Sequence, residues 1–273
     1  MKAPRAPKPV LKTVLICHEG ALFDQDGLAR WLSSFSCLVG LVVLRESYKR
    51  ILRVVRHEIR RGGIGGLLNV LAFQIYYRLF MARKDELWER WALEKLRGSY
   101  PQTNENAPVL YATGPNAAEV KEFVESLRPD IMLARCKTLL KEDIFTIPRI
   151  GTFVMHPGIC PEYRNAHGCF WALANGKLDK VGITLLQVGQ GVDTGPVYGY
   201  YTYPYDEVKE SHHVIQQRAV LENLDKLKSK LLEIYGGSAI PLDTTGRDSV
   251  VWGKPQLTSY LKWRRRVRKA RRL

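Results

Sequence analysis

Cysteine is scarce in this sequence, and no two cysteines form a CxxC pair. The five cysteines are scattered along 273 residues: Cys17, Cys37, Cys136, Cys160 and Cys169. A disulfide framework is typically built from an even set of cysteines, and a structural zinc site from clustered ones. We therefore expect neither of them, and we expect a cytoplasmic protein without a metal ion.

Acidic residues and long apolar runs are also lacking. Asp and Glu number 27 against 42 Lys and Arg, which gives a formal net charge of +15. The long, largely apolar segment Leu67–Met81 is interrupted by Asn69, Gln74 and Arg78, and it is shorter than the roughly 20 apolar residues of a membrane-spanning helix. The basic, proline-containing start of the chain lacks the apolar centre of a secretory signal. The sequence thus predicts neither a membrane span nor a signal peptide.

Two apolar segments near the start of the chain predict a parallel sheet. Thr13–Cys17 and Cys37–Leu44 have the composition of strands buried on both faces, and Leu22–Phe35 between them is predicted to be a helix. Such a strand–helix–strand unit has a right-handed crossover. We therefore predict an α/β fold with a mostly parallel, Rossmann-like sheet. No GxGxxG motif follows the first strand, so a dinucleotide site is not predicted.

The later segments extend this pattern. Short strands are predicted at Val109–Tyr111 and Ile131–Ala134. A helix over Asn116–Leu127 should begin with Asn116 as its cap and Glu119 as the reciprocal partner of a capping box. One long helix is predicted over Val208–Tyr235.

A helical insertion interrupts the alternation of strands and helices at residues 47–97. Its arginines lie between apolar residues that recur at helical spacing. Two interpretations are open. The insertion covers the sheet or a dimer interface, or it lies as a basic amphipathic helix on an anionic membrane or against a phosphorylated substrate.

The stretch from Gly151 to Gly195 contains four short motifs in a fixed order. They are His156-Pro157-Gly158, Pro161-Glu162-Tyr163-Arg164, Gly182-Ile183-Thr184 and Asp193-Thr194-Gly195. The histidine follows a predicted strand, and the aspartate follows the next one, which is where open α/β sheets collect ligands. In order and in spacing these motifs resemble the folate-dependent formyltransferases, which include glycinamide ribonucleotide, methionyl-tRNA and sugar formyltransferases.

The resemblance implies a fold, a reaction and a domain organisation. It implies a Rossmann-like sheet of the formyltransferase type in a catalytic domain, residues 1–205, which carries the insertion at 47–97. Residues 206–273 would then form a C-terminal helix and a basic tail. The reaction implied is formyl transfer from 10-formyltetrahydrofolate to the amine of a small molecule.

The resemblance also assigns residues to the site. His156 would polarise the formyl oxygen and relay a proton, and Asp193 would keep His156 charged or position a water molecule. We expect both at strand ends, outside the core. The remaining assignments concern binding: Tyr163, Arg164 and Asn165 for the substrate, and Lys137, Thr138, Leu139, Leu140, Gly189, Gly191 and Val192 for the folate.

One departure from the family pattern concerns the chemistry. The family has an asparagine two residues before the histidine, and Val154 stands there in this chain. Losing one donor to an oxyanion costs roughly 10²–10³ in rate. Three alternatives follow: another donor such as Asn165 substitutes, the reaction has become hydrolysis or other one-carbon chemistry, or the protein binds folate or substrate without turnover. Asn165 is otherwise interpreted as a turn residue with a left-handed backbone.

The basic segment Trp263–Leu273 does not by itself identify a binding partner. We interpret it as a solvated tail, with contact to an anionic membrane or to RNA as the alternatives. No RNA-binding motif accompanies it, so a nucleic-acid partner is not expected. A homodimer also remains open.

Overall fold

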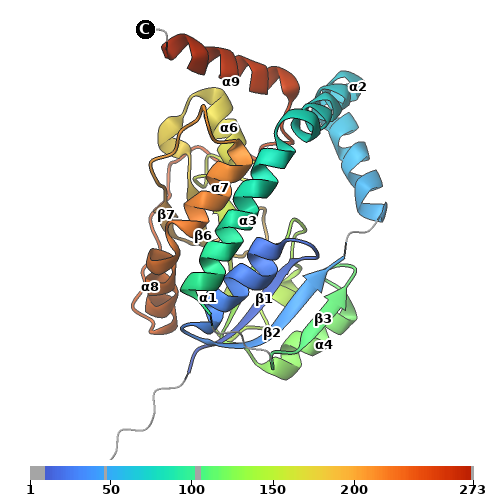
Figure 1. The fold of residues 1–273 in the computed structure, drawn as a ribbon. Coiled ribbons are helices and arrows are strands. Elements are labelled where there is room, and N and C mark those ends of the chain that lie inside the picture. Colours follow the sequence, from blue (N-terminus) through green and yellow to red (C-terminus); the bar gives the residue numbers. More distant parts are fainter. Residues whose placement is uncertain (1–9, 46–47, 102–105, 272–273) are drawn as a thin grey trace, which may run out of the picture.

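The structure is a computed structural model that describes residues 10–45, 48–101 and 106–271, without the side chains of 48–54 and 57 (Figure 1). The start of the chain and the last two residues of the predicted tail therefore lie outside the described residues. The seven strands are β1 (Lys12–His18), β2 (Cys37–Leu44), β3 (Val109–Ala112), β4 (Ile131–Ala134), β5 (Gly151–Pro157), β6 (Ile183–Gln187) and β7 (Val197–Tyr201).

These strands form one sheet in the order β3-β2-β1-β4-β5-β6-β7. The pairs from β3 to β5 are parallel, whereas β6 runs antiparallel to both of its neighbours. The predicted α/β fold with a mostly parallel sheet is confirmed. Because β4 and β5 are parallel, the loops that follow them leave the same edge of the sheet, and the loop after β6 starts from the opposite edge.

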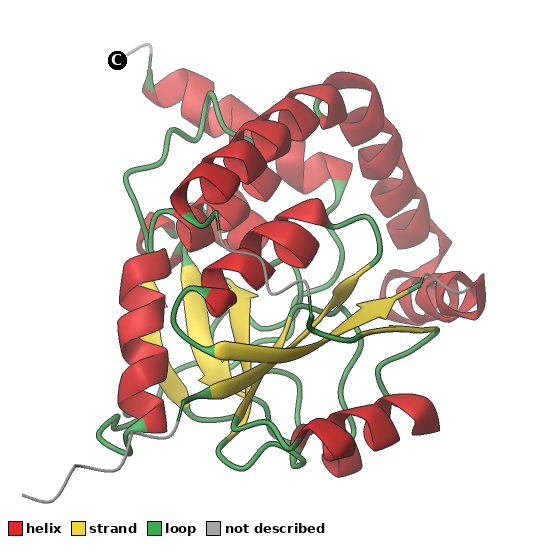
Figure 2. Ribbon diagram, turned by 60° about the horizontal axis from the view of Figure 1, so that its bottom comes forward, coloured by secondary structure: helices red, strands yellow, loops and turns green. Residues whose placement is uncertain are grey.

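Helices connect and cover the strands. In chain order they are the π-helical turn η1 (Phe23–Leu28), α1 (Ala29–Ser33), α2 (Tyr48–Phe80), α3 (Ala82–Ser99), α4 (Ala118–Leu127), α5 (Glu142–Phe145), α6 (Gly168–Asn175), the 3₁₀ turn η2 (Leu178–Lys180), α7 (His212–Leu221), α8 (Leu224–Tyr235) and α9 (Leu257–Ala270). Most of them gather on one side of the sheet, and α4 lies on the other (Figure 2).

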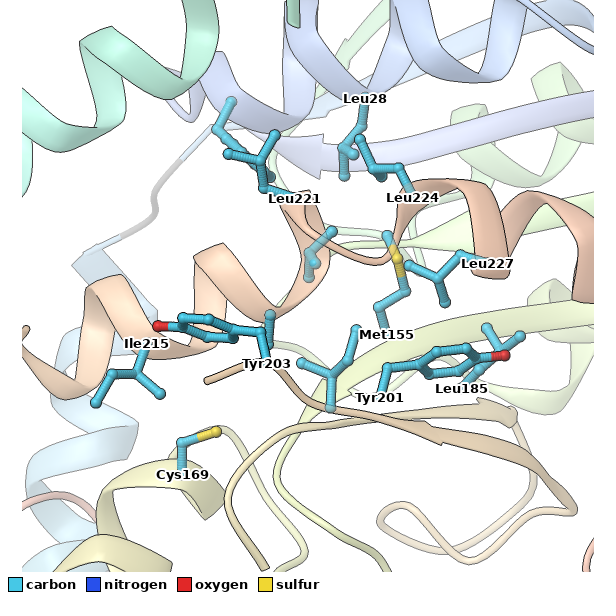
Figure 3. Close-up of a cluster of buried hydrophobic side chains, with 14 of the residues drawn as sticks. Leu28, Met155, Cys169, Leu185, Tyr201, Tyr203, Ile215, Leu221, Leu224 and Leu227 are labelled. Carbon is cyan, nitrogen blue, oxygen red and sulfur yellow. The ribbon is translucent and has the colours of Figure 1, made fainter. Parts of the chain in front are cut away.

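Alternate residues of the strands enter two separate cores. Leu15 and Met155 join the larger cluster, which includes side chains of α1, α6, α7 and α8. Val14 and Met132 point the other way, into a smaller cluster under α4 and α5. Figure 3 shows part of the larger cluster, where Met155 lies among leucines from α7 and α8. This alternation is what the period of two in a strand requires.

The helical insertion consists of α2 and α3, and α2 itself is kinked. Within α2, Gly63 has φ 64° and breaks the helix, and α3 follows after Met81. Among the described residues no single helix is long and apolar enough to cross a membrane; only Glu58–Phe80 and Ala82–Ser99 taken together have that length and composition, and they are bent by 63°.

Three predictions about elements are wrong. The long C-terminal helix is two helices, α7 and α8, because buried Asn223 turns its side chain to the carbonyl oxygens of Thr202 and Ala219. The tail forms the helix α9, with Trp263 fully buried. The cap of α4 is Ala117, since the side chain of Asn116 is bonded instead to Leu139 and Lys141.

Candidate active site

His156 lies in β5, opposite Thr184 of β6, and it is buried with a side chain 4% exposed. His156 does lie at the end of its strand, since β5 ends at Pro157, but the expectation that it lies outside the core is wrong. Both ring nitrogens have partners: Nε2 lies 2.7 Å from the carbonyl oxygen of Tyr163, and Nδ1 lies 3.3 Å from Oδ2 of Asp193. A carbonyl oxygen only accepts hydrogen bonds, so Nε2 carries a proton.

The second nitrogen of this ring faces a carboxylate, which favours a proton there as well. Burial alone would lower the pKa of His156, but the neighbouring Cys160 thiol and the Asp193 carboxylate outweigh burial and hold its pKa well above the usual value. With a proton on both nitrogens the ring is an imidazolium. The site thus contains a buried positive charge whose counter-ion is Asp193.

Asp193 follows β6 in a tight turn. Its own backbone is left-handed, with φ 49°, a conformation that aspartate tolerates better than most residues. Besides His156, Oδ2 accepts a hydrogen bond of 2.8 Å from the amide of Asn165. Burial would raise the pKa of Asp193, but the charge and hydrogen bond of His156, followed by the Asn165 amide, hold it below the usual value.

The loop after His156 is held by close backbone contacts. A Cβ atom on Gly158 would lie 2.8 Å from Cα of Gly168 and 2.8 Å from the carbonyl oxygen of Tyr163, so only glycine fits there. Thr184 donates from Oγ1 to the carbonyl of Gly158 and accepts from the amide of Cys160. The glycine after His156-Pro157 and the threonine of Gly182-Ile183-Thr184 therefore share one role, which is to shape this loop.

The three residues predicted for substrate binding lie on this loop but make protein contacts. Tyr163 is buried, and Arg164 donates from Nη1 to the carbonyl of Val192. Asn165 has φ 77°, its Nδ2 donates to the carbonyl of Trp252, and its Oδ1 accepts from the amide of Ala166. The positive φ agrees with the interpretation of Asn165 as a turn residue with a left-handed backbone. Its side chain is occupied elsewhere and does not replace the missing asparagine.

The partner of this loop is a segment that the motifs did not predict. Residues 250–253, which we call the strap, run beside the loop with three backbone hydrogen bonds between Pro161 or Arg164 and Val250 or Trp252. The Trp252 ring stacks on the rings of Tyr163 and Trp171, with centroids 5.5 Å and 5.0 Å apart. A tryptophan just before the basic helix was the only sequence signal for this contact.

Val154 lies two residues before His156, on the same face of β5, and it is partly buried against apolar groups. It pairs with Leu186 across the strands. It packs against the cluster of Cys160, Leu186 and Val197 on one side and against the smaller core on the other. The place of the family asparagine is therefore filled by hydrocarbon.

The two segments predicted to bind folate adjoin the smaller core, against which Val154 also packs. In the first, the Lys137 amide donates to Nε2 of His18, Leu139 is 58% exposed, and Leu140 belongs to the smaller core that also contacts Val188. Thr138 lies between them. In the second, the chain folds back on itself so closely that a Cβ on Gly195 would lie 1.9 Å from the carbonyl oxygen of Gln187. This hairpin turn carries the remaining predicted residues, Gly189, Gly191 and Val192.

Arg135 is a site residue that the motifs did not single out. It pairs with the buried Asp24 at 3.0 Å, donates to the backbone carbonyl of Met155, next to His156, and reaches Gln217 of α7. Its position directly after β4 was the available signal. His167, the residue before α6, is neutral, because burial together with Lys254 and Lys137 lowers its pKa to about 3.

Comparison with known proteins places this geometry in a family. Residues 73–227 match the formyl transferase family. The methionyl-tRNA formyltransferase of Thermotoga maritima is 27% identical over 134 residues, which are 46% of this chain and 42% of that protein. The bifunctional polymyxin resistance protein ArnA of Wigglesworthia glossinidia brevipalpis is 30% identical over 135 residues, 46% of this chain and 20% of that protein. The chain thus spans less than half the length of these curated relatives.

Solved structures show the same fold at low sequence identity. Phosphoribosylglycinamide formyltransferase from Anaplasma phagocytophilum is 13% identical with a TM-score of 0.53, covering 89% of this chain and 98% of its own. A sugar N-formyltransferase from Shewanella is 11% identical with a TM-score of 0.51, covering 93% and 86%. Because the family match extends over more than half of the sequence, the chain belongs to the formyl transferase family.

Proposed function

We propose that this protein transfers a formyl group from 10-formyltetrahydrofolate to the amine of a small molecule. The observation that carries the proposal is the buried His156–Asp193 pair, 3.3 Å apart, which joins β5 to the loop after β6. A tetrahedral oxyanion forms when an amine attacks a formyl carbon, and a fixed positive charge in a site shielded from water stabilises it. Family membership supports the folate donor.

Asp193 is the residue of the pair that accepts a proton during the reaction. The amine nitrogen bonds to the formyl carbon and loses a proton, the bond from that carbon to the folate nitrogen breaks, and the folate nitrogen gains a proton. Oδ2 of Asp193 is occupied by His156 and Asn165. Oδ1, which has no partner within the described parts of the chain, accepts the amine's proton directly or through a water molecule.

His156 supplies the positive charge for the oxyanion. Its Nε2 proton is bonded to the carbonyl of Tyr163, so direct donation to the formyl oxygen requires the loop 158–165 to release that bond. Apo geometry of this kind often tightens or rearranges when the reactants bind. The strap, which stacks on Tyr163, would then control how readily the loop moves.

An apolar cluster that includes Val154 supports folate binding at this place. Leu140 and the partly buried Cys136, Val154 and Val188 belong to one apolar cluster, and the exposed Leu139 lies next to Leu140 along the chain. A flat heterocycle is held well by an apolar wall with backbone groups at its rim. Lys137–Leu140 and Gly189–Val192 would form that site, with the main chain making the polar contacts.

A hydrolase is the second candidate, and the apolar environment of Val154 is the observation that favours it. Without the family donor the site has one hydrogen bond fewer for the oxyanion, and water can replace a poorly held amine. A protein that binds folate without turnover is the third candidate.

One assay separates these candidates. The protein is incubated with 10-formyltetrahydrofolate carrying a ¹³C-labelled formyl group and with a panel of amino sugars and other biosynthetic amines, and the products are identified by mass spectrometry. We expect labelled formamide of one amine class. Labelled formate in place of a formamide would identify a hydrolase, and binding of tetrahydrofolate without either product would identify a binding protein.

A further inference from the structure

The second half of α2 is apolar on two opposite sides. One side faces the core through Val70 and Phe73, which are 2% and 4% exposed. The opposite side carries a stripe of five exposed aliphatic residues: Ile64 at 70%, Leu68 at 59%, Leu71 at 40%, Ile75 at 61% and Leu79 at 71%. Their spacing places them within one narrow sector of the helix, over a length of about 22 Å.

Such a stripe is not expected on a helix that faces only water. A surface helix normally turns its polar residues outward, and a helix that is apolar all round is covered by protein or lipid. Core packing does not explain the stripe, because these five side chains are the exposed ones. The described part of the chain therefore leaves this second apolar side of α2 uncovered.

A strongly basic helix, α9, packs against the same half of α2. The ring of Tyr260 in α9 lies against the rings of Phe73 and Tyr76, with centroids 5.5 Å and 5.3 Å apart. Both α2 and α9 also pack on Phe170 of α6 (Figure 1). Each helix thus turns its opposite side away from the same core. On α9 that side carries four exposed cations, Lys262, Arg265, Arg268 and Lys269. We call the stripe and these four cations together the α2–α9 surface.

The charge of this region has one sign. Residues 59–84 and 257–271 contain twelve Lys and Arg and no Asp or Glu. None of the four α9 cations forms an ion pair with a described residue. A partner that fits the surface has to offer both an apolar layer and negative charge.

We propose that the α2–α9 surface binds an anionic lipid bilayer. The helix lies in the plane of the interface, with the aliphatic stripe among the acyl chains and the α9 cations at the lipid phosphates. Amphipathic helices bind membranes in this way, and basic residues near an anionic leaflet add to the binding. This proposal is independent of the reaction proposed above.

Two other partners fit the surface less well. Nucleic acid pairs with cations and stacks on exposed aromatic rings, but it offers nothing to five aliphatic side chains, and the α9 aromatics Tyr260 and Trp263 are buried. In a two-fold dimer the same surface meets itself. That arrangement would bring the unbalanced cations of two copies together.

Vesicle flotation with the full chain tests the proposal. Binding is compared between vesicles of phosphatidylcholine alone and vesicles that also contain phosphatidylglycerol, at low and at high salt. We expect binding only to the anionic vesicles and weaker binding at high salt, because salt screens the phosphate contacts. No binding to either kind of vesicle would overturn the proposal.

Two variants with matched controls connect binding to the surface. The stripe variant, Leu68→Gln with Ile75→Gln and Leu79→Gln, is compared with glutamine at three exposed apolar residues elsewhere: Leu178, Leu232 and Ile240. The charge variant, Lys262→Gln with Arg265→Gln and Lys269→Gln, is compared with glutamine at Lys12, Lys177 and Lys226. We expect each surface variant to bind at least about tenfold more weakly and each control to bind like the wild type.

The same four variants also show whether the protein still folds and whether it binds RNA or a second copy of itself instead. The substituted side chains are exposed, so all variants should keep the wild-type melting temperature and formyl-transfer rate with a water-soluble acceptor. Equal vesicle binding by surface variants and controls would contradict the proposal. So would a concentration-dependent dimer that the stripe variant abolishes without vesicle binding, or RNA binding that persists in the stripe variant while vesicles are ignored.

Discussion

Burial lowers the pKa of His156, and Cys160 and Asp193 together raise it above its usual value. The ring is bonded to a carbonyl at Nε2, so the charge of the ring depends on whether Nδ1 keeps its proton beside the carboxylate. Asp193→Asn preserves the size of the side chain and an oxygen for the Asn165 amide. Burial then acts without a counter-ion, and we expect the pKa of His156 to fall, as measured by NMR of ¹⁵N-labelled histidine. An unchanged pKa would show that Asp193 is not the partner that holds the charge.

The same substitution should have a characteristic effect on stability against pH. The pKa of His156 is raised by folding, so its contribution is present below the unfolded pKa and is lost as pH rises through the folded one. The pKa of Asp193 is lowered, so its contribution is lost as pH falls through its folded value. Urea unfolding of wild type and Asp193→Asn should therefore differ most between these two limits and converge outside them.

Val154 is the residue at which the family pattern and this chain differ. We expect Val154→Asn to give no gain in formyl transfer, because its neighbours Leu186 and Val197 are apolar. An unpaired amide there should lower the free energy of unfolding by about 1–3 kcal/mol. Val39→Asn, at a half-buried valine of β2, controls for the general cost of this change. A rise in initial rate of more than about tenfold would show that the site lacks a donor and accepts one.

The sequence motifs predicted which residues belong to the site, but not how their side chains are oriented. The motifs located His156 and Asp193, and the structure brings them together because the loop after β6 carries Asp193 back to β5, where His156 lies. Three features could not be read from the motifs: the burial of His156, the bond from Nε2 to Tyr163, and the bond from Asn165 to Trp252. Each depends on a contact between segments whose spacing in the sequence carries no signal.

At the scale of elements, the strap is the segment that holds the loop of the site. Trp252 stacks between Tyr163 and Trp171 and donates from Nε1 to the carbonyl of Glu162. We expect Trp252→Ala to lower the free energy of unfolding by about 2–4 kcal/mol and to lower the rate of formyl transfer. Trp91→Ala, at a half-exposed tryptophan of α3, should change either quantity far less. Equal effects of the two variants on stability and rate would show that the strap has no specific role in the site.

Strands were easier to predict than the connections between them. Cys37–Leu44 and Ile131–Ala134 agree with the structure at both ends, because continuous apolar runs bounded by polar residues leave little choice. The break between α7 and α8 was missed, since a leucine repeat continues through it and only the buried hydrogen bonds of Asn223 decide it. The α9 helix was missed because its basic residues obscure the few apolar ones that are buried.

At the scale of the molecule, the C-terminal residues share the core of the sheet. Ile215, Leu227 and Trp263 belong to the same cluster as Met155 of β5. Arg266 also donates to the last carbonyls of α6, at Leu173 and Ala174. The division at residue 205 therefore does not separate two cores.

A chain of residues 1–205 should not fold by itself. Removing α7 to α9 exposes apolar side chains on one face of β5 and β6, and an exposed apolar face of that size leads to aggregation or a loosely packed state. We expect the truncated chain to lack near-ultraviolet circular dichroism and a cooperative melting transition. A sharp transition comparable to that of the full chain would instead establish an independent domain.

His156→Gln in a single-turnover assay tests the role of the buried pair most directly. The full-length protein, in excess over 10-formyltetrahydrofolate, is mixed with the accepted amine, and formamide is measured over time, with tetrahydrofolate binding and thermal melting as controls for the pocket and the fold. We predict a rate at least about 10²-fold below that of the wild type, the usual cost of removing one group that stabilises an oxyanion, with folate binding retained. A well-folded variant that binds folate and transfers the formyl group at the wild-type rate would contradict a catalytic His156.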